Sequence, residues 1–331
     1  MDKMPTLAYL YSTSIPGLYR RPITVTAGSN GMPSNYPIQI VLDTASLISS
    51  GKMRNDCGDI RFYKSDGTPL SYYIEPYTIN TSSTLIWVLD PDSLSANSSH
   101  VIYMYYGNKN LTSQSNPQNV FLFFQNFENG SVSDWVTIQG SGTNTADTSQ
   151  AKDGIYSHKL FGSGSGSDFI VSKTLPSVIS TPFAYEVWVR EYAAYNAFSF
   201  YQSDGSTYIT LWWRRDDAGR YKPEIRLTNG TLQTGLGIDN LDFNMWHRFR
   251  IYFNSSSDLR FNWIYNGTKD EGTYGPFSPS ISNLKSITFG CYNYNRGQGW
   301  QDHIIIRKYV NPEPTITIGS EQRFGKLSDF I

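Results

Sequence analysis

The sequence has few charged residues, only two cysteines and no long apolar run, and each shortage excludes a class of protein. Charged residues make up 17% of the 331 positions, and 27 Lys and Arg almost balance 28 Asp and Glu, giving a formal net charge of −1. Binding to nucleic acid or to an acidic membrane surface needs a basic excess, so neither partner is expected. No segment reaches the ~18 consecutive apolar residues of a membrane-spanning helix, so no direct membrane insertion is expected either.

Motifs for cofactors and targeting are also missing. Cys57 and Cys291 lie 234 positions apart, so we expect no disulfide framework and interpret both as small strand residues or free thiols. The four histidines are scattered and give no zinc-binding spacing. There is no phosphate loop, nucleophile elbow or H-E-x-x-H helix, so no organic cofactor is expected. The N-terminal segment lacks the apolar core and cleavage site of a signal peptide.

Aromatic residues, by contrast, reach 15% and recur at alternate positions, whereas no sustained helical periodicity is present. In Phe183–Arg190 every second residue is apolar, and His247–Phe253 shows the same alternation. Residues 259–265 alternate up to Asn266-Gly267, a dipeptide that favours a tight hairpin turn. This pattern predicts an all-β protein made of two consecutive antiparallel β-sandwiches.

Spacing of the predicted strands divides the chain. Residues 1–116 are expected to form an immunoglobulin-sized sandwich and residues 120–320 a larger sandwich, a jelly roll. The polar stretch Asn108–Asn119 is the best candidate for a linker between them. Residues 321–331 carry no usable pattern and are expected to be a C-terminal tail.

The first domain contains a series of recognisable segments in order. They are Leu47–Met53, Asp59–Phe62, Asp66-Gly67, Ile86–Val88 and Ile102–Asn108. With these segments the domain resembles an uncharacterised prokaryotic family, domain of unknown function 2341. The resemblance implies an accessory domain of large cell-surface proteins, many of them archaeal, without an established catalytic motif. Within the second segment, Asp59 and Arg61 share one face of a predicted strand and are expected to pair.

The second domain resembles the concanavalin A-like jelly-roll superfamily, which includes laminin-G-type modules, lectins and glucanases. The segments that carry this resemblance are Phe124–Glu128, Asn244–Ile251, Phe261–Gly267 and Trp300–Ile306. It implies a jelly roll with a lectin-like role. His247 in the second of these segments is interpreted as a packed strand residue rather than a ligand.

Enzymatic activity is not expected from the spacing of the carboxylates. Jelly-roll glucanases usually carry two carboxylates at i, i+2 or i, i+4, which places them on one face of a strand. Glu186 and Glu191 are separated by an odd number of positions and fall on opposite faces. A glycoside hydrolase or a lyase is the alternative, because folding could assemble such a site from distant residues.

We therefore expect a non-catalytic binding or adhesion protein that recognises carbohydrate through its jelly roll. Its expected partners are glycans or glycoprotein surfaces, and its expected location is extracellular, on a cell surface or on a virion. Seven N-x-S/T sequons fit such a location, although chance would give nearly as many. The alternative is a structural subunit of an extracellular filament or virion, such as a spike or fibre, which would self-assemble.

Two aromatic segments are candidates for glycan contacts, because sugars stack on aromatic rings and bond to planar polar side chains. Tyr208–Arg215 contains two adjacent tryptophans, of which one would be core and the other exposed. The second segment follows a strand and has glycines that predict a loop. The candidate residues are Trp212, Trp213, Arg215, Tyr292, Tyr294, Arg296 and Trp300. The alternative is that these rings complete the core.

Calcium is the one cofactor that the second resemblance suggests, because jelly rolls of this superfamily often bring their first and last strands side by side. Asn126, Glu128 and Asp302 lie in those two segments and offer the oxygen ligands that calcium prefers. The alternative is that Glu128 caps a turn and Asp302 pairs with Arg307.

Overall fold

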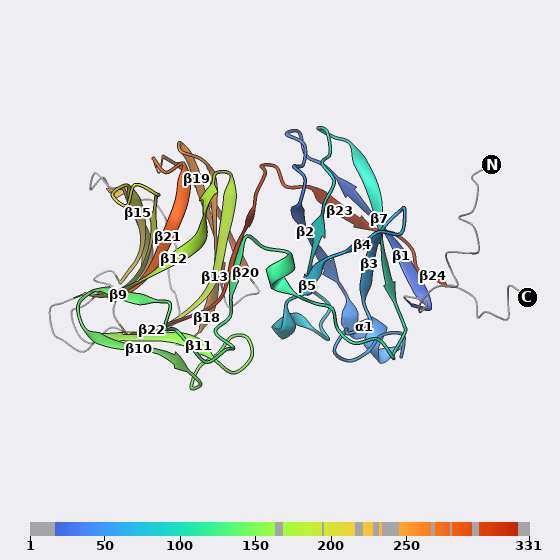
Figure 1. Cartoon of the computed structure of the whole chain (residues 1–331), viewed down its shortest axis with the longest axis horizontal. Helices are drawn as coiled ribbons and strands as arrows, with labels where there is room; N and C mark the ends of the chain where they lie inside the picture. Colours follow the sequence, from blue (N-terminus) through green and yellow to red (C-terminus); the bar gives the residue numbers. More distant parts are fainter. Residues whose placement is uncertain are drawn as a thin grey trace, which may run out of the picture. The chain divides into compact units, whose positions relative to one another are not determined.

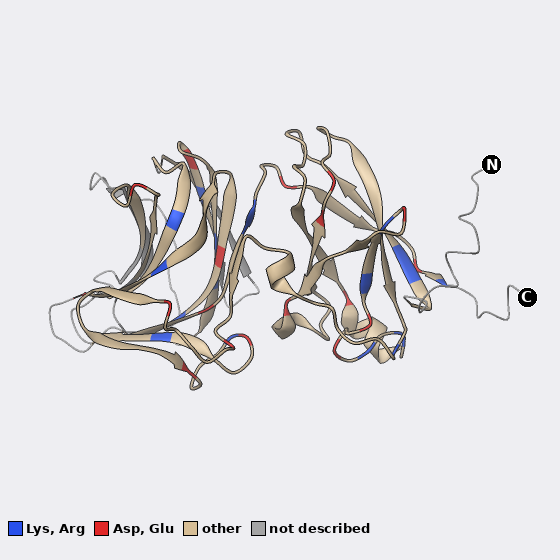
Figure 2. Cartoon of the chain, viewed as in Figure 1, with Lys and Arg blue, Asp and Glu red and all other residues tan. Residues whose placement is uncertain are grey.

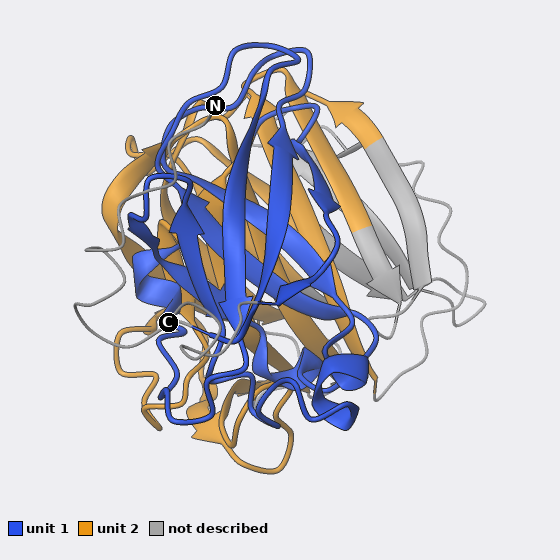
Figure 3. Cartoon of the chain, turned by 90° about the vertical axis from the view of Figure 1, so that its right-hand side faces the viewer, with its two compact units in different colours: residues 1–120, 310–331 blue, residues 121–309 orange. Residues whose placement is uncertain are grey.

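The computed structural model describes residues 17–162, 168–193, 195–215, 221–227, 232–233, 245–265, 269–278, 280–292 and 298–323. Within these ranges the side chains of residues 191–196, 212–233, 263–274 and 292 are not described. The chain divides into two units, which Figure 3 distinguishes by colour. Unit 1 comprises residues 1–120 and 310–331, and unit 2 comprises residues 121–309.

Unit 1 is a small β-sandwich (Figure 1). One sheet has the order β23-β1-β7-β3-β4, with β24 also paired to β1, and the other has the order β2-β6-β5. Its elements are β1 (Tyr19–Thr26), β2 (Tyr36–Leu42), α1 (Thr44–Ser49), β3 (Arg61–Lys64), β4 (Pro69–Leu70), β5 (Tyr72–Ile74), η2 (Pro76–Thr78), β6 (Thr84–Asp90), β7 (Ser99–Tyr106), η3 (Pro117–Asn119), β23 (Thr315–Ile318) and β24 (Gln322–Arg323).

The core of unit 1 follows from alternation along these strands. Ile23 and Val25 of β1 are fully buried, as are Ile102, Met104 and Tyr106 of β7, which pairs with β1. Asp43 accepts a hydrogen bond from the backbone of Ser46 and so caps the N-terminus of α1.

The end of the chain returns to unit 1, and this corrects the expected domain boundaries. Strand β23 pairs with β1 from Ile23–Ile318 to Thr26–Thr315, and β24 pairs with the beginning of β1. Glu321 also binds Lys52 and the hydroxyl of Tyr106. Residues 310–331 are therefore part of the first sandwich, so unit 2 does not extend to residue 320 and residues 321–323 do not form a separate tail.

Unit 2 is a larger sandwich of two sheets. Its strands are β8 (Phe123–Gln125), β9 (Val136–Gln139), β10 (Gly142–Asp147), β11 (Ser157–Gly162), β12 (Phe169–Ser180), β13 (Phe183–Ala193), β14 (Tyr195–Tyr201), β15 (Tyr208–Arg215), β16 (Tyr221–Leu227), β17 (Leu232–Gln233), β18 (Trp246–Ser255), β19 (Asp258–Tyr265), β20 (Lys269–Phe277), β21 (Asn283–Tyr292) and β22 (Gln298–Lys308). The β13 sheet has the order β10-β11-β22-β13-β18-β19-β20, with β8 beside β22. The β14 sheet has the order β17-β16-β15-β14-β21-β12-β9.

One apolar cluster fills the space between these two sheets. Phe183, Tyr185, Val187 and Val189 of β13 are buried in it, as the alternation predicted. Phe198 and Phe200 of β14, together with Phe289 of β21, are buried in the same cluster. His247 is 6% exposed within β18, which agrees with its interpretation as a packed strand residue. The all-β prediction of two antiparallel sandwiches is confirmed.

The distribution of charge and the state of the two thiols agree with the composition. Figure 2 shows acidic and basic residues distributed over both units. Cys57 and Cys291 are free and buried in different units, and burial raises the pKa of the Cys57 thiol to about 11, so this thiol is unreactive at neutral pH. Within the described part of the chain, no helix is long and apolar enough to cross a membrane.

Deleting residues 310–331 should destabilise unit 1 while leaving unit 2 folded. The deletion removes both strands that cover one edge of β1 and exposes the apolar residues that β1 buries. Hydrogen–deuterium exchange of peptides from β1 and β7 should become much faster, whereas exchange in β13 and β18 should not change. Equal protection of β1 in both chains would contradict this role of β23 and β24.

Candidate functional site

A row of hydroxyl side chains crosses four strands of the β14 sheet. Ser172 of β12 is paired with Thr288 of β21, Thr288 with Ser199 of β14, and Ser199 with Thr210 of β15. Directly paired residues share a face, and the neighbours Phe198 and Phe200 point into the core, so the row lies on the opposite side of the sheet. We call this side, defined by the four hydroxyl residues, the hydroxyl face.

Hydrogen bonds join members of the row to one another. The Oγ of Ser199 lies 2.8 Å from Oγ1 of Thr210, and Oγ1 of Thr288 accepts a hydrogen bond of 3.0 Å from the backbone N–H of Ser199. Ser199, Thr210 and Thr288 are buried at 1–5% exposure, whereas Ser172 is partly exposed. The row is therefore fixed in position by its own contacts.

Two tyrosines lie next to the row on the same side of the sheet. Tyr201 and Tyr208 are paired in register, two positions from Ser199 and Thr210, and both are partly exposed. Their rings are stacked, with centroids 4.8 Å apart and an interplanar angle of 27°. Burial, and to a lesser extent the neighbouring Tyr208, raises the pKa of Tyr201. On the other side of the row, Ala197 pairs with Gly290, so these two central strands carry little side-chain bulk there.

For most of the residues predicted to contact glycan, only the backbone is described. Others lie outside the described residues. Trp212 takes the register position opposite Ala197, and Trp213 that opposite Asn196. Arg215 ends β15, and Tyr292 ends β21. Tyr294 and Arg296 lie outside the described residues.

Trp300 differs from the expectation of a solvent-facing ring. It lies on β22 of the β13 sheet, is 4% exposed and donates a hydrogen bond of 2.8 Å from Nε1 to Asp147. Lys159 lies 5.3 Å from its ring centroid. A ring buried by its own unit offers no free face for a sugar, so Trp300 is a packing residue here.

Sequence reasoning missed the hydroxyl face, although a signal was present. Residues 197–201 and 208–211 alternate between large apolar side chains and small or hydroxyl-bearing ones. A strand that is apolar on one side and carries Ser, Thr and Tyr on the other has one face for the core and one for contact. For these strands, the predicted glycan contacts were instead based on the two tryptophans of Tyr208–Arg215.

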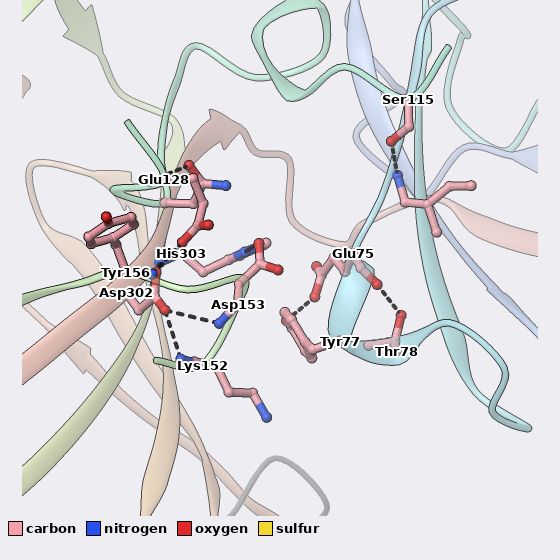
Figure 4. A network of polar contacts seen from close by, with 12 residues as sticks. Glu75, Tyr77, Thr78, Ser115, Glu128, Lys152, Asp153, Tyr156, Asp302 and His303 are labelled. Atoms are coloured by element: carbon pink, nitrogen blue, oxygen red, sulfur yellow. Dashed lines mark hydrogen bonds and ion pairs between the residues drawn. The ribbon is translucent and has the colours of Figure 1, made fainter. Parts of the chain in front are cut away.

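Two of the three predicted calcium ligands hold the two ends of one loop (Figure 4). Oδ2 of Asp302 accepts hydrogen bonds from the backbone N–H groups of Lys152 and Asp153, and Oδ1 accepts one from His303. Oε1 of Glu128 accepts bonds from the N–H groups of Ile155 and Tyr156. Burial, with the nearby Asp153 carboxylate, raises the pKa of Asp302 well above its usual range.

The surroundings of these carboxylates are specific. Gly154 has a φ of +66°, and a Cβ there would lie 2.2 Å from the Glu128 carboxyl group, so only glycine fits. Asn126 uses its side-chain oxygen to accept a long 3.4 Å bond from the backbone of Glu128. Asp302 does not pair with Arg307, because Arg307 binds Glu186.

Glu186 is the centre of a buried ion cluster on β13. Its carboxylate binds Arg248 at 2.7 Å, Arg307 at 2.8 Å and Arg250 at 3.0 Å. Burial favours the neutral acid, but the three guanidinium groups outweigh it and hold the pKa of Glu186 well below its usual range. A general acid needs the opposite shift.

Unit 1 contains a second cluster of ionisable groups. Among the described residues, Asp90, Asp92 and His100 are the set of three whose metal-ligating atoms all lie within 4.8 Å of one another. His100 Nε2 is 2.6 Å from Asp90, and Lys64 is 3.0 Å from Asp92. These contacts form an ion-pair network in which the ammonium group of Lys64 already neutralises Asp92.

Comparison with known families supports the resemblance expected for the first domain. Residues 56–138 match the family model described as Domain of unknown function (DUF2341), which covers the second half of unit 1 and the beginning of unit 2. No curated protein is significantly similar to the sequence.

Solved structures with a similar fold are distant. "Cellulose induced protein, Cip1" is 14% identical with a TM-score of 0.44, over 56% of this chain and 97% of that one. An endo-beta-1,4-glucuronan lyase from Trichoderma reesei is 12% identical with a TM-score of 0.42, over 57% and 96%. A protein with a galectin-like fold from Bacillus subtilis is 11% identical with a TM-score of 0.43, over 57% and 96%.

One buried histidine makes the stability of unit 2 depend on pH. His158 is fully buried, with Nε2 2.7 Å from Oδ1 of Asn144 and Nδ1 2.8 Å from Nε2 of Gln301. Burial lowers the pKa of His158 to about 3. In the unfolded chain His158 takes up a proton near pH 6.5, whereas in the folded unit it does so only near pH 3. The free energy of unfolding therefore falls as the pH falls between these two values.

Replacing His158 by glutamine should remove this pH dependence. Between about pH 6 and pH 4 the unfolding free energy of the wild-type protein should fall more steeply than that of His158→Gln, by roughly 1.4 kcal/mol per pH unit. Urea denaturation at several pH values, followed by tryptophan fluorescence, measures both slopes. Parallel slopes would show that the folded histidine takes up its proton as readily as the unfolded one.

Proposed function

We propose that unit 2 is a non-catalytic carbohydrate-binding module that contacts its ligand through Tyr201 and Tyr208, the partly exposed pair on the hydroxyl face. The observation that carries the proposal is the stacking of these two rings, which bear phenol hydroxyls, beside the mostly buried hydroxyl row. Sugars pair an apolar C–H face with a ring of hydroxyls, so they bind where aromatic rings and hydrogen-bonding groups lie side by side.

Residues of the two aromatic segments extend this proposal. Trp212 and Tyr292 belong to the strands that carry the hydroxyl face, and Trp213 and Arg215 lie on the same strand as Trp212. With Tyr294 and Arg296 they remain candidate contacts for a longer glycan. The ion cluster keeps Glu186 charged, so this residue is unsuited to act as a general acid. This favours a binding protein over a glycoside hydrolase. We place the protein outside the cell or at a cell or virion surface, where glycans are presented.

Alanine at Tyr201 and at Tyr208 tests the proposal. Each ring contributes about 0.5–1.5 kcal/mol to a stacked contact beyond the area it buries, so losing both rings, about 1–3 kcal/mol, should weaken glycan binding roughly 5- to 150-fold. A glycan array identifies the sugars bound, and titration calorimetry compares the affinities of the wild-type and double-variant proteins.

The matched control is Tyr63→Ala in unit 1. Tyr63 is also partly exposed and packs in a ring pair, with its centroid 5.5 Å from that of Tyr105. The Tyr63→Ala substitution should leave glycan binding by unit 2 unchanged. If the double variant in unit 2 binds like the wild-type protein at equal melting temperature, the hydroxyl face is not the contact surface.

We also propose that calcium binds at the loop between Glu128 and Asp302. Asp302 is buried and Asp153 nearly so, their charges repel, and the partners of Asp302 in the structure are three backbone N–H groups. Calcium prefers carboxylate and carbonyl oxygens, and the 150–156 loop offers both. Asp302 and Asp153 would hold the ion together with carbonyl oxygens of this loop, and the ion would supply Asp302 with the positive charge that its backbone partners do not.

Removing calcium should lower the melting temperature of unit 2 by several degrees. A ligand present at a hundred times its Kd adds about 2.7 kcal/mol to stability, and Asp302→Asn should abolish the difference between calcium and EDTA. Asp134→Asn is the control, because Asp134 is a surface carboxylate paired with Lys173. Equal melting in calcium and EDTA, with no calcium found by elemental analysis, would exclude the site.

A further inference from the structure

Unit 1 has a pocket of about 490 Å³ where β4 and β5 run beside the 108–119 segment. This volume is within the usual range of small-ligand sites. Pro69, Leu70 and Tyr72 form the apolar part of its wall. The polar part of the lining consists of Ser71, Ser113, Gln114, Ser115, Asn116 and Asn119.

The pocket wall is rigid although it contains a segment that was predicted to be a linker. Arg61 is 6% exposed and donates a hydrogen bond of 2.5 Å to the carbonyl of Thr112, and Arg54 donates one of 2.9 Å to that of Leu111. Arg61 does not pair with Asp59, which instead accepts bonds from the backbone of Arg54 and Gly107. The segment therefore belongs to unit 1.

Further bonds attach the segment to strand β5. The backbone N–H of Asn116 donates to the carbonyl of Tyr72 at 2.9 Å, and the N–H of Ile74 donates to Oγ of Ser115, also at 2.9 Å. These bonds occupy the outer edge of β5, since its other edge pairs with β6. An extended peptide would need that edge in order to add a strand, so peptide binding by strand addition is disfavoured.

The chemistry of the lining defines the class of ligand. None of the nine lining residues is charged, so a charged ligand would meet no counter-charge. The phenol of Tyr72 is already occupied, since it donates to the carbonyl of Ile60 and accepts from Arg61 and from the N–H of Gln114. The side chains of Gln114 and Asn119 are exposed and make no hydrogen bond within the described residues.

Each of these amides presents a donor and an acceptor in one plane, which matches two neighbouring hydroxyl groups of a sugar ring. Ser71, also exposed, adds a hydroxyl to the same wall. We propose that this pocket binds a neutral saccharide through Gln114, Asn119 and Ser71. The site is separate from the hydroxyl face of unit 2 and does not depend on it.

Three variants of the full chain test the proposal. Gln114→Ala with Asn119→Ala removes both amides, and Ser71→Trp fills the pocket while keeping them. Asn110→Ala is the matched control, because Asn110 is an exposed amide on the same segment that does not line the pocket. The probe is an array of neutral, sialylated and sulfated oligosaccharides and short peptides, followed by titration calorimetry with the neutral oligosaccharides that bind the wild-type protein.

The expected result is at least a tenfold loss of affinity for one or more neutral oligosaccharides in both pocket variants, with unchanged melting temperature and normal binding by Asn110→Ala. This loss should also occur in a protein that carries Tyr201→Ala and Tyr208→Ala, which separates the two sites. The proposal is overturned if no neutral oligosaccharide binds, if the pocket variants bind neutral oligosaccharides normally, or if only peptides or acidic sugars respond to them. If the tyrosine variants alone lose binding, the hydroxyl face stands and the pocket does not.

Discussion

Strand β1 depends on residues from the other end of the chain. It pairs with β7 along one edge and with β23 and β24 along the other, so the first sheet of unit 1 is completed only by residues 315–323. An uncovered β1 would present a row of unpaired backbone groups beside an apolar core. Because both ends of unit 2 connect to unit 1, unit 2 is an insertion within the first sandwich. Unit 1 is therefore completed only after unit 2 has been synthesised.

The strands of unit 2 show how one pattern produces both core and contact surface. In β14, phenylalanines at 198 and 200 fill the interior, and this leaves residues 197, 199 and 201 for the other side. Neighbouring strands repeat the pattern in register, so single hydroxyl groups from four strands become a continuous row. The polar surface is a geometric consequence of how the core is packed, and the tyrosine pair lies beside it for the same reason.

Local pattern predicted the strands well and long-range pairing poorly. Alternation from Phe183 to Val189 identified β13 and its buried face, because a strand's side chains alternate whatever its partner. The alternation of Thr315–Ile318 is equally visible, but its partner β1 lies about 290 positions earlier, and no local signal specifies that pairing. The fold class could be predicted, whereas the domain boundaries required the sheet topology.

The candidate sites follow the same division. Asp302 and Glu128 were predicted to meet, and the structure brings both to one loop, because β8, which precedes Glu128, pairs with β22, which carries Asp302. Trp300 was expected to face solvent because it follows a glycine-rich stretch. Its hydrogen-bond partner, Asp147, is 153 positions away and removes the ring from the surface. The 108–119 segment looked like a linker because its anchors are the distant side chains of Arg54 and Arg61.

Buried acids in unit 2 are stabilised in two different ways, and this difference decides which of them the calcium proposal concerns. Glu186 has three arginines within 3.0 Å, so its charge is compensated by the protein and its pKa is low. Asp302 is equally buried, but the groups that bind it are backbone N–H dipoles, and Asp153 adds a second negative charge, so its pKa is raised. Neutral dipoles offset the desolvation of a carboxylate only in part. A divalent cation would complete the second site and has no place in the first, which is why calcium is proposed at Asp302 and not at Glu186.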